Sequence, residues 1–345
     1  MGMTIKDIAK KCGVGVSTVS RALNNHPDIN PETKEMILKT VAESDFVPNN
    51  SARNLKRIDA KAIAILVKEI DNPFFATMMR VMEKEIRREK YNFFIQHMGE
   101  NQDEVEAAME LVKEKRLRGI IFLGGDFRSK TDRISRIKVP FVVSTAGLPE
   151  TPKNCIGSFV TIDDREESRK MTAHLCRKGH KRIAILASDK KDENIGKLRL
   201  EGYLEALKAY GIPADEKLIR HLEGRDTAYS MENGYRMMKK LLQENTDFTA
   251  VFAISDLMVI GACKALLEAG RRIPEDVAVA GFDGLAYTEF FEPSITTMAQ
   301  PLEEIAKESV GSLFEMINTK ESRAGKYLPA ELLERTSTQL PEGGN

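Results

Sequence analysis

Short apolar runs alternate with amphipathic stretches from residue 62 onward, and this alternation constrains the fold of the chain most strongly. Each run is five to seven residues long, the length of a strand, and is largely apolar on both faces. Strands of that kind that alternate with helices form parallel sheets covered by helices on both sides. The runs are 62–67, 93–98, 119–124, 141–145, 183–188, 250–255 and 277–283, and the helical stretches are 74–90, 102–117, 165–178, 196–210, 229–244, 256–269 and 301–317.

The number of these units predicts more than one sheet. About ten strand-helix units exceed the usual size of a single sheet, and their pattern repeats around residue 163. The 345 residues of the chain also exceed one ordinary domain, since about 150 residues per domain is typical. The sequence therefore predicts an α/β core of two doubly wound parallel-sheet subdomains.

The first 48 residues have a different pattern, that of three short helices. Thr4 with Asp7 forms a capping box, and the glycines of 13–15 break the first helix. Ser17 is the expected cap of a second helix, and Asn30 followed by proline opens a third. Two helices joined by a glycine turn predict a helix-turn-helix headpiece. The residues expected to face inward are Ile5, Ile8, Ala9, Val19, Ala22, Leu23, Met36, Ile37 and Val41.

The segment 49–61 is polar and basic, with one conspicuous apolar residue, Leu55. It is too short to hold a helix alone in water, so it is a linker unless a partner orders it. Residues 1–61 carry ten Lys/Arg against seven Asp/Glu, although the whole chain is neutral. This offset favours a polyanionic partner for the N-terminal module. The predicted divisions are a headpiece at 1–48, a hinge or linker at 49–61 and a core at 62–345.

Several classes of protein are excluded by what the sequence lacks. No apolar run approaches the ~18 residues of a membrane span, and the first residues lack the apolar centre of a secretion signal. No glycine-rich phosphate loop, nucleophile elbow or metal-ligand spacing occurs. We therefore expect a cytoplasmic protein with reduced thiols and no cofactor or metal, and nothing argues for an enzyme. The four scattered cysteines are Cys12, Cys155, Cys176 and Cys263.

Polar side chains follow the predicted strands at their carboxyl ends, where parallel α/β sheets bind ligands. Phenylalanines, an arginine, carboxylates and an amide gather there, a set that suits a hydroxylated or anionic small molecule. Alternatively, Asp256 caps the next helix, Arg199 is a solvated surface charge, and Asp283 is a turn aspartate. Either phenylalanine is equally a core residue. The candidates are Phe74, Phe75, Asp126, Thr145, Asp189, Arg199, Asp256, Asp283 and Gln300.

Motifs spread over the whole chain occur in one order: TIKDIA (4–9), GV (13–14), STVSRALN (17–24), VPN (47–49), ARNL (52–55), DNPFF (71–75), GHKRIA (179–184), FD (282–283), PSITT (293–297), Gln300 and ERTS (334–337). Together they resemble those of the lactose/galactose repressor (LacI-GalR) family of transcription regulators. The resemblance implies a core like that of periplasmic sugar-binding proteins, in which the chain crosses between the subdomains three times. The implied N-subdomain is about 62–162 plus 293–325, and the C-subdomain about 163–292 plus 326–340.

The resemblance also implies roles for residues of the headpiece and hinge on operator DNA. The second helix would enter the major groove, where Arg21 is able to contact guanine through two hydrogen bonds. The hinge would become a helix in the minor groove, with Leu55 wedged between base steps. The implied DNA-binding residues are Thr4, Val16, Ser17, Thr18, Ser20, Arg21, Asn24, Ala52, Leu55 and Lys56.

In the core, the resemblance implies that a small-molecule effector, most simply a sugar or sugar derivative, controls a repressor that binds a near-palindrome as a homodimer. The resemblance places Phe74, Phe75, Arg199, Asp283 and Gln300 at positions that contact the effector, and Thr145 and Asp256, which follow predicted strands, complete the expected effector-binding set. Thr145 stands where many relatives carry an aspartate, which keeps open an alternative in which a protein partner controls the regulator. A distant alternative is an enzyme on the α/β core. The C-terminus lacks a leucine heptad, which favours a dimer over a tetramer.

Overall fold

A computed structural model of the protein describes residues 3–23, 26–44, 61–68, 70–99, 102–127, 131–148, 154–223, 229–244 and 246–339. The chain forms two compact units, Met1–Ala60 and Lys61–Asn345. Among the described residues, no helix combines the length and the apolar character needed to cross a membrane.

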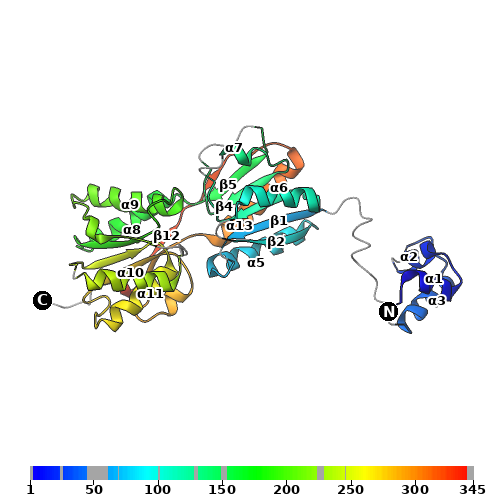
Figure 1. Ribbon diagram of the computed structural model, residues 1–345, viewed down its shortest axis with the longest axis horizontal. Helices are drawn as coiled ribbons and strands as arrows, with labels where there is room; N and C mark the ends of the chain where they lie inside the picture. Colours follow the sequence, from blue (N-terminus) through cyan, green and yellow to red (C-terminus); the bar gives the residue numbers. More distant parts are fainter. Residues whose placement is uncertain are drawn as a thin grey trace. The chain divides into compact units, whose positions relative to one another are not determined.

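The N-terminal unit contains three helices in the part of the chain that the structure describes: α1 (Ile5–Cys12), α2 (Val16–Leu23) and α3 (Pro31–Ala42) (Figure 1). The capping box is present, since the Thr4 amide donates to Asp7 Oδ2 at 2.9 Å and the Asp7 amide donates to Thr4 Oγ1 at 3.4 Å. Gly13, at φ +64°, ends α1 in the left-handed conformation. The carbonyl of Gly15 accepts the first hydrogen bonds of α2, from Thr18 and Val19. The prediction that Ser17 caps α2 is therefore wrong, because the helix already begins at Val16.

A small apolar core holds the three helices together. Met36 is not part of it: its side chain is 43% exposed, so the prediction that Met36 is buried is wrong. Ile37 and Val41 share the face of α3 that packs inward, and Met36 lies about 100° around the helix from Ile37. The buried residues are Ile8, Ala9, Val19, Ala22 and Ile37, with Ile5, Cys12, Val14, Leu23, Ile29 and Val41 packed against them.

The second unit contains two six-stranded sheets, which confirms the predicted α/β architecture. In the first sheet the strand order is β11-β5-β4-β3-β1-β2, and all neighbours are parallel. In the second the order is β12-β10-β9-β8-β6-β7, in which only the edge strand β12 is antiparallel. The strands are β1 (Ala62–Lys68), β2 (Asn92–Met98), β3 (Gly119–Leu123), β4 (Phe141–Ser144), β5 (Gly157–Thr161), β6 (Ile183–Ala187), β7 (Ile219–His221), β8 (Ala250–Ala253), β9 (Ala278–Asp283), β10 (Thr296–Ala299), β11 (Lys326–Tyr327) and β12 (Glu331–Leu333).

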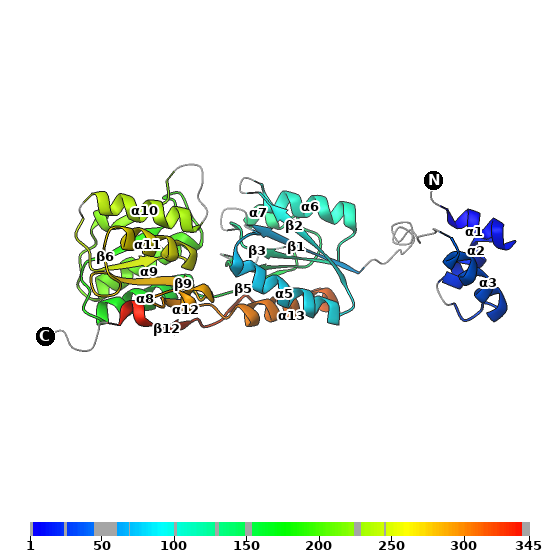
Figure 2. The ribbon, with the colours of Figure 1, turned by 90° about the horizontal axis from the view of Figure 1, so that it is seen from below.

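Helices cover both faces of each sheet, as the doubly apolar strands require. On β1, Ile63, Ile65 and Val67 join one hydrophobic cluster, whereas the alternate residues Ala62, Ala64 and Leu66 join another. We call the part of the core built on the first sheet the first lobe and the part built on the second sheet the second lobe. In the first lobe, α5 (Pro73–Arg88) and α13 (Leu302–Thr319) lie opposite α6 (Glu104–Lys115) and α7 (Thr131–Ile134) (Figure 2). In the second lobe, α8 (Asp164–Arg177) and α9 (Ile195–Ala209) lie opposite α10 (Met231–Gln243) and α11 (Asp256–Glu268), and α12 (Tyr287–Phe290) follows β9.

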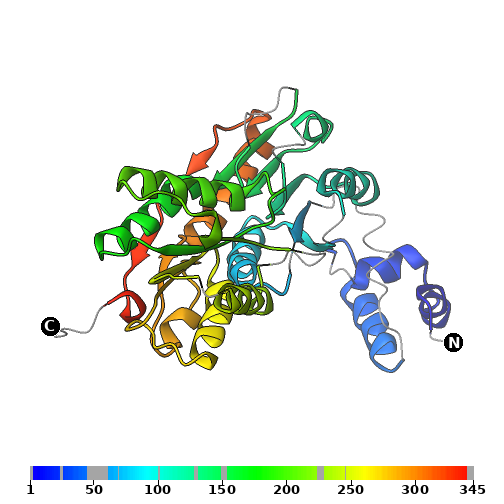
Figure 3. The ribbon, with the colours of Figure 1, turned by 60° about the vertical axis from the view of Figure 1, so that its left-hand side comes forward.

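The chain passes between the lobes three times, but two crossings lie elsewhere than expected. β10 belongs to the second sheet, so the chain returns to the first lobe after Ala299 rather than at 293. β11 belongs to the first sheet, so the last crossing follows Tyr327 rather than 325. Both strands are too short and polar to be recognised as apolar runs. Figure 3 shows these orange and red segments running between the two lobes.

Helices α10 and α11 pack with their backbones in contact, which only glycine permits. A methyl group on Gly261 would overlap the carbonyl oxygen of Met231, and one on Gly234 would overlap that of Met258. Gly311, in contrast, lies on the exposed side of α13, where a methyl group would meet nothing within 4 Å. Two helical glycines therefore offer opposite responses to the same substitution.

We expect Gly261→Ala to lower the free energy of unfolding by about 1–3 kcal/mol or more, because the helices must separate to admit the methyl group. Gly311→Ala should instead raise it, by up to about 1 kcal/mol, since alanine favours the helix. Urea unfolding followed by circular dichroism measures both variants. Equal effects of the two substitutions would contradict the role of Gly261 in the helix contact.

Candidate functional site

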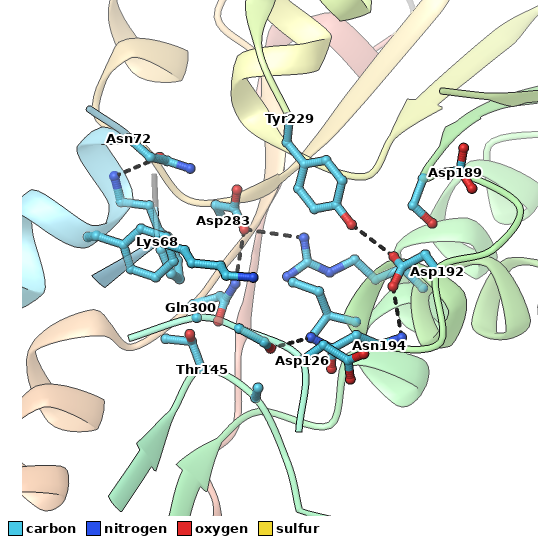
Figure 4. A pocket seen from close by; sticks show the side chains of 18 of the residues that line it. Lys68, Asn72, Asp126, Thr145, Asp189, Asp192, Asn194, Tyr229, Asp283 and Gln300 are labelled. Atoms are coloured by element: carbon cyan, nitrogen blue, oxygen red, sulfur yellow. Dashed lines mark hydrogen bonds and ion pairs between the residues drawn. The ribbon is translucent and has the colours of Figure 1, made fainter. Parts of the chain in front are cut away.

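A cavity of about 410 Å³ lies between the two lobes, at the carboxyl ends of strands from both sheets. Its volume lies within the usual range of small-molecule sites. Its wall combines two phenylalanine rings with many polar side chains (Figure 4). The residues that line it are Lys68, Asn72, Phe74, Phe75, Gly124, Gly125, Asp126, Thr145, Ala146, Ser188, Asp189, Lys191, Asp192, Asn194, Ile195, Arg199, Tyr229, Asp283 and Gln300.

The structure brings six of the seven effector-binding candidates to this cavity: Phe74, Phe75, Thr145, Arg199, Asp283 and Gln300. Asp126 and Asp189, which the sequence also singled out, line it as well. They come from positions up to 226 residues apart in the chain, and parallel strands bring them to one edge.

Asp256 does not line the cavity, so its assignment to the effector site is corrected. Its fully buried carboxylate accepts hydrogen bonds from the Leu285 amide and the Thr297 hydroxyl, each at 2.7 Å. The alternative that Asp256 caps α11 is also wrong, because Ser255 Oγ accepts the capping bond from the Met258 amide. Asp256 instead ties the segment after β9 to β10.

Arg199 is buried at the base of the cavity rather than solvated on the surface. Its Nε donates to Asp164 Oδ1 at 2.8 Å, and its Nη1 lies 3.4 Å from Asp283 Oδ1. Its guanidinium also lies 3.8 Å from the centre of the Phe282 ring. Gln300 Nε2 donates to the same Asp283 oxygen at 2.9 Å. These contacts fix the Arg199 and Asp283 side chains relative to each other.

Burial changes the proton affinity of two carboxyl groups near Arg199. It raises the pKa of Asp283 to about 6, and the charge of Arg199 and the hydrogen bond from Gln300 oppose that rise. Burial, and next the nearby charge of Asp283, raise the pKa of Asp256 well above its usual value. The native state therefore binds protons at these positions more readily than the unfolded chain does.

The two phenylalanines form an apolar wall at the start of α5. Asn72 caps this helix by accepting from the Phe74 amide at 3.1 Å, and Pro73 occupies its first position. The two rings meet edge to face with centroids 5.2 Å apart. A side chain at Gly124, which has φ +70°, would come within 2.9 Å of the Phe75 ring. Each phenylalanine is thus largely buried and also lines the cavity. The interpretation of these residues as core residues is therefore compatible with their interpretation as part of the ligand site.

Two of the lining residues hold a strained backbone. Thr145 has φ +68° and Asp283 has φ +122°, in a region that residues with a side chain rarely occupy. Such conformations cost of order 1–3 kcal/mol each and concentrate at functional sites. The strain therefore adds weight to this cavity as the functional site of the core.

Sequence reasoning missed several lining residues on the loop that leads into α9. Asp192 accepts hydrogen bonds from the Asn194 amide at 2.8 Å and from the Tyr229 hydroxyl at 3.1 Å. Asn194 Nδ2 donates across the cleft to the Gly125 carbonyl at 2.6 Å, so it joins the two lobes directly. These residues follow no strand immediately and form no motif, which left no signal for them in the sequence. Across the described ranges, no group of three His, Cys, Asp or Glu residues could hold a metal ion.

In the N-terminal unit, α2 presents Val16, Ser17 and Arg21 to solvent, and Thr18 and Ser20 are partly buried. Thr4 is exposed at the start of α1. Ser17 and Arg21 are four residues apart and so lie on one face of the helix. The remaining DNA-binding candidates lie outside the described residues: Asn24, Ala52, Leu55 and Lys56.

Comparison with known proteins agrees with both units. Residues 4–49 match the family of bacterial regulatory proteins of the lacI type, and residues 172–338 match a periplasmic binding protein-like domain. Over 337 residues the chain is 39% identical to the HTH-type transcriptional regulator MalR of Clostridium butyricum, covering 97% of this chain and 99% of the relative. It is 31% identical over 339 residues to the repressor PurR of Pasteurella multocida, covering 97% and 98%.

Two solved structures extend the likeness to ligand complexes. The transcriptional regulator CelR in complex with cellobiose has a TM-score of 0.70 at 29% identity, over 97% of this chain and 99% of that one. A LacI family regulator from Enterococcus faecium with bound ribose has a TM-score of 0.68 at 29% identity, over 80% and 98%. A helix-turn-helix unit followed by a ligand-binding α/β core defines a DNA-binding transcription regulator. The chain belongs to the LacI family of these regulators.

The raised pKa of Asp283 gives stability a definite dependence on pH. Between about pH 4 and pH 6 the native carboxyl binds more protons than the unfolded one, whose pKa is 3.8. The contribution of Asp283 to the free energy of unfolding therefore decreases as the pH rises across that window. We expect the free energy of unfolding of the wild type, relative to that of Asp283→Asn, to decrease from pH 4 to pH 6. Urea unfolding of both proteins measures this difference. A difference that is constant or grows with pH would contradict the assignment.

Proposed function

We propose that the protein is a repressor that binds a near-palindromic operator as a homodimer and releases or retains it according to a sugar-like molecule in the interlobe cavity. The observation that carries the effector part is the fixed Arg199–Asp283–Gln300 cluster beside the Phe74–Phe75 wall. A sugar has an apolar C–H face that suits aromatic rings and hydroxyl groups that suit carboxylates and amides. The cellobiose and ribose complexes of the two similar regulators support this class of ligand.

The DNA-binding part of the proposal rests on the exposed face of α2. In the major groove, Arg21 would read a guanine, with Val16 and Ser17 beside it. Thr4, Thr18, Ser20 and Asn24 would bind phosphates or orient the helix. The hinge residues Ala52, Leu55 and Lys56 would enter the minor groove, with Leu55 as the apolar wedge.

Exposed apolar side chains support a homodimer of the core. On β2, an edge strand of the first sheet, Phe94 and Ile95 are 45% and 46% exposed. On α12 of the second lobe, Tyr287 is 54% and Phe290 is 84% exposed. Large apolar side chains exposed on both lobes of the core suit burial against a second copy of the chain.

Allosteric control would follow from closure of the lobes around the effector. The cavity wall includes residues of both lobes, and the Asn194–Gly125 hydrogen bond already spans the cleft. A molecule that contacts both lobes binds the closed arrangement more tightly than the open one, and only such a difference shifts the equilibrium. A coupling of about 1–3 kcal/mol would change operator affinity about 5- to 150-fold.

Thermal unfolding against a panel of sugars, sugar phosphates, nucleobases and carboxylates tests the effector part. A sugar at about 100 times its Kd should stabilise the protein by roughly 2.7 kcal/mol. Asp189→Ala, within the cavity wall, should reduce that stabilisation, and Asp247→Ala, at an exposed site outside the wall, should leave it unchanged. A panel without any hit, with DNA binding intact, would instead favour control by a protein partner.

The reading of DNA by Arg21 is tested with an operator selected from random duplexes by the wild-type protein. Arg21→Ala should weaken binding to this operator by about 1–3 kcal/mol and relax the preference at one base pair. Lys11→Ala, an exposed charge at the end of α1, should leave that preference intact. Fluorescence anisotropy at fixed salt measures both, and an equal loss for Arg21→Ala on operator and random DNA would contradict its reading role.

A further inference from the structure

We propose that Glu104, a residue that does not line the cavity, determines which ligand charge the cavity accepts. By neutralising Lys68, it makes the cavity select uncharged sugars over their phosphate esters. This inference rests on the proposed function, because it concerns the ligand of the same cavity. It assigns a specificity role to a pair of residues for which the sequence offered no motif.

Lys68, the last residue of β1, is the lysine that the first lobe contributes to the described cavity wall. Its side chain is 24% exposed, and Figure 4 shows it among the side chains that project into the cavity. Its Nζ lies 2.5 Å from Glu104 Oε1. An unpaired ammonium at this point would be a ready site for a phosphate group, but here the charge is already matched.

Glu104 is held directly behind the cavity wall. It is the first residue of α6, after the Asp103 cap, and its side chain is only 2% exposed. A methyl group on Gly125, which lines the cavity, would lie 3.0 Å from Glu104 Oε1. Because a buried carboxylate without a partner is costly, Glu104 holds the Lys68 ammonium in place. A phosphate would have to compete with that carboxylate for the same cation.

The other cations of the wall do not replace Lys68 as an anion site. Arg199 is buried between Asp164 and Asp283, which share its charge. Lys191 is exposed, and the carboxylates of Asp189 and Asp192 are its near neighbours in the chain. The described wall thus has three cations and four carboxylates, with Glu104 and Asp164 behind it.

This excess of negative charge repels a phosphate ester but favours hydroxyl groups, which donate hydrogen bonds to carboxylate oxygens. A neutral sugar therefore gains contacts at the wall without bringing in charge. The same electrostatics tolerate an amino group on the sugar. The wall consequently discriminates by charge, whereas the Phe74–Phe75 surface discriminates by shape.

Matched pairs of neutral sugars and their monophosphates test the proposal: ribose, glucose, maltose and cellobiose, each with its phosphate ester, titrated by calorimetry at fixed salt. The wild type should bind at least one neutral sugar about tenfold or more tightly than its ester. In Glu104→Gln, which frees the Lys68 charge, the ester should gain about tenfold relative to the neutral sugar. Glu110→Gln, an exposed charge on the same helix, should leave the ratio unchanged.

A double variant separates charge from damage to the fold. Lys68→Gln with Glu104→Gln removes both charges, so it should keep the preference of the wild type for the neutral sugar; a double variant that favours the ester overturns the proposal. Two other results also overturn it: a ratio of ester affinity to neutral-sugar affinity in Glu104→Gln that equals the wild-type ratio, and tighter binding of an ester than of its neutral sugar by the wild type. Neither result contradicts a small-molecule effector. Binding of no sugar and no ester would overturn the proposed effector as well.

Discussion

The buried guanidinium of Arg199 is the interaction on which the second lobe and the cavity both depend. It connects α9 to the start of α8 through Asp164, to the end of β9 through Asp283, and to the carbonyl of Ile254 after β8. Burying one charge is expensive, and only a complete set of partners offsets the loss of water. The cluster therefore fixes where three strand and helix ends meet, and that meeting point is the base of the cavity.

Most strands of the core are predictable from the local sequence pattern, whereas the short strands β10 and β11 are not. Runs such as 62–67 and 183–188 are predictable because a strand buried on both faces must be apolar throughout. β10 and β11 have four and two residues and include threonine, lysine and tyrosine, so only pairing with a neighbouring strand makes them strands. That pairing is decided by tertiary contacts, which explains why two lobe boundaries were misplaced.

The same distinction holds at the site. Residues at or shortly after the carboxyl end of a strand, such as Asp283 and Asp126, were predictable because the carboxyl ends of parallel strands converge. Asp256 also follows a strand, but its side chain turns to the Leu285 amide, and sequence alone does not reveal that direction. The Lys68–Glu104 pair joins residues 36 positions apart on different elements, so no local spacing announces it. Position along a strand is thus predictable, and the partner that neutralises a charge is not.

The three crossings between lobes determine the order in which the protein is completed during synthesis. Helix α13 packs on α5 and on the sheet that contains β3, β4 and β5, burying Val310, Leu313 and Phe314 there. Because this helix begins at Leu302, after the last parallel strand of the second lobe, a ribosome makes the second lobe as far as β10 before this helix can cover the first lobe. The first sheet thus emerges early with one apolar face incomplete, and the second lobe closes only when β12 arrives. Neither lobe is therefore encoded by one continuous stretch of the gene.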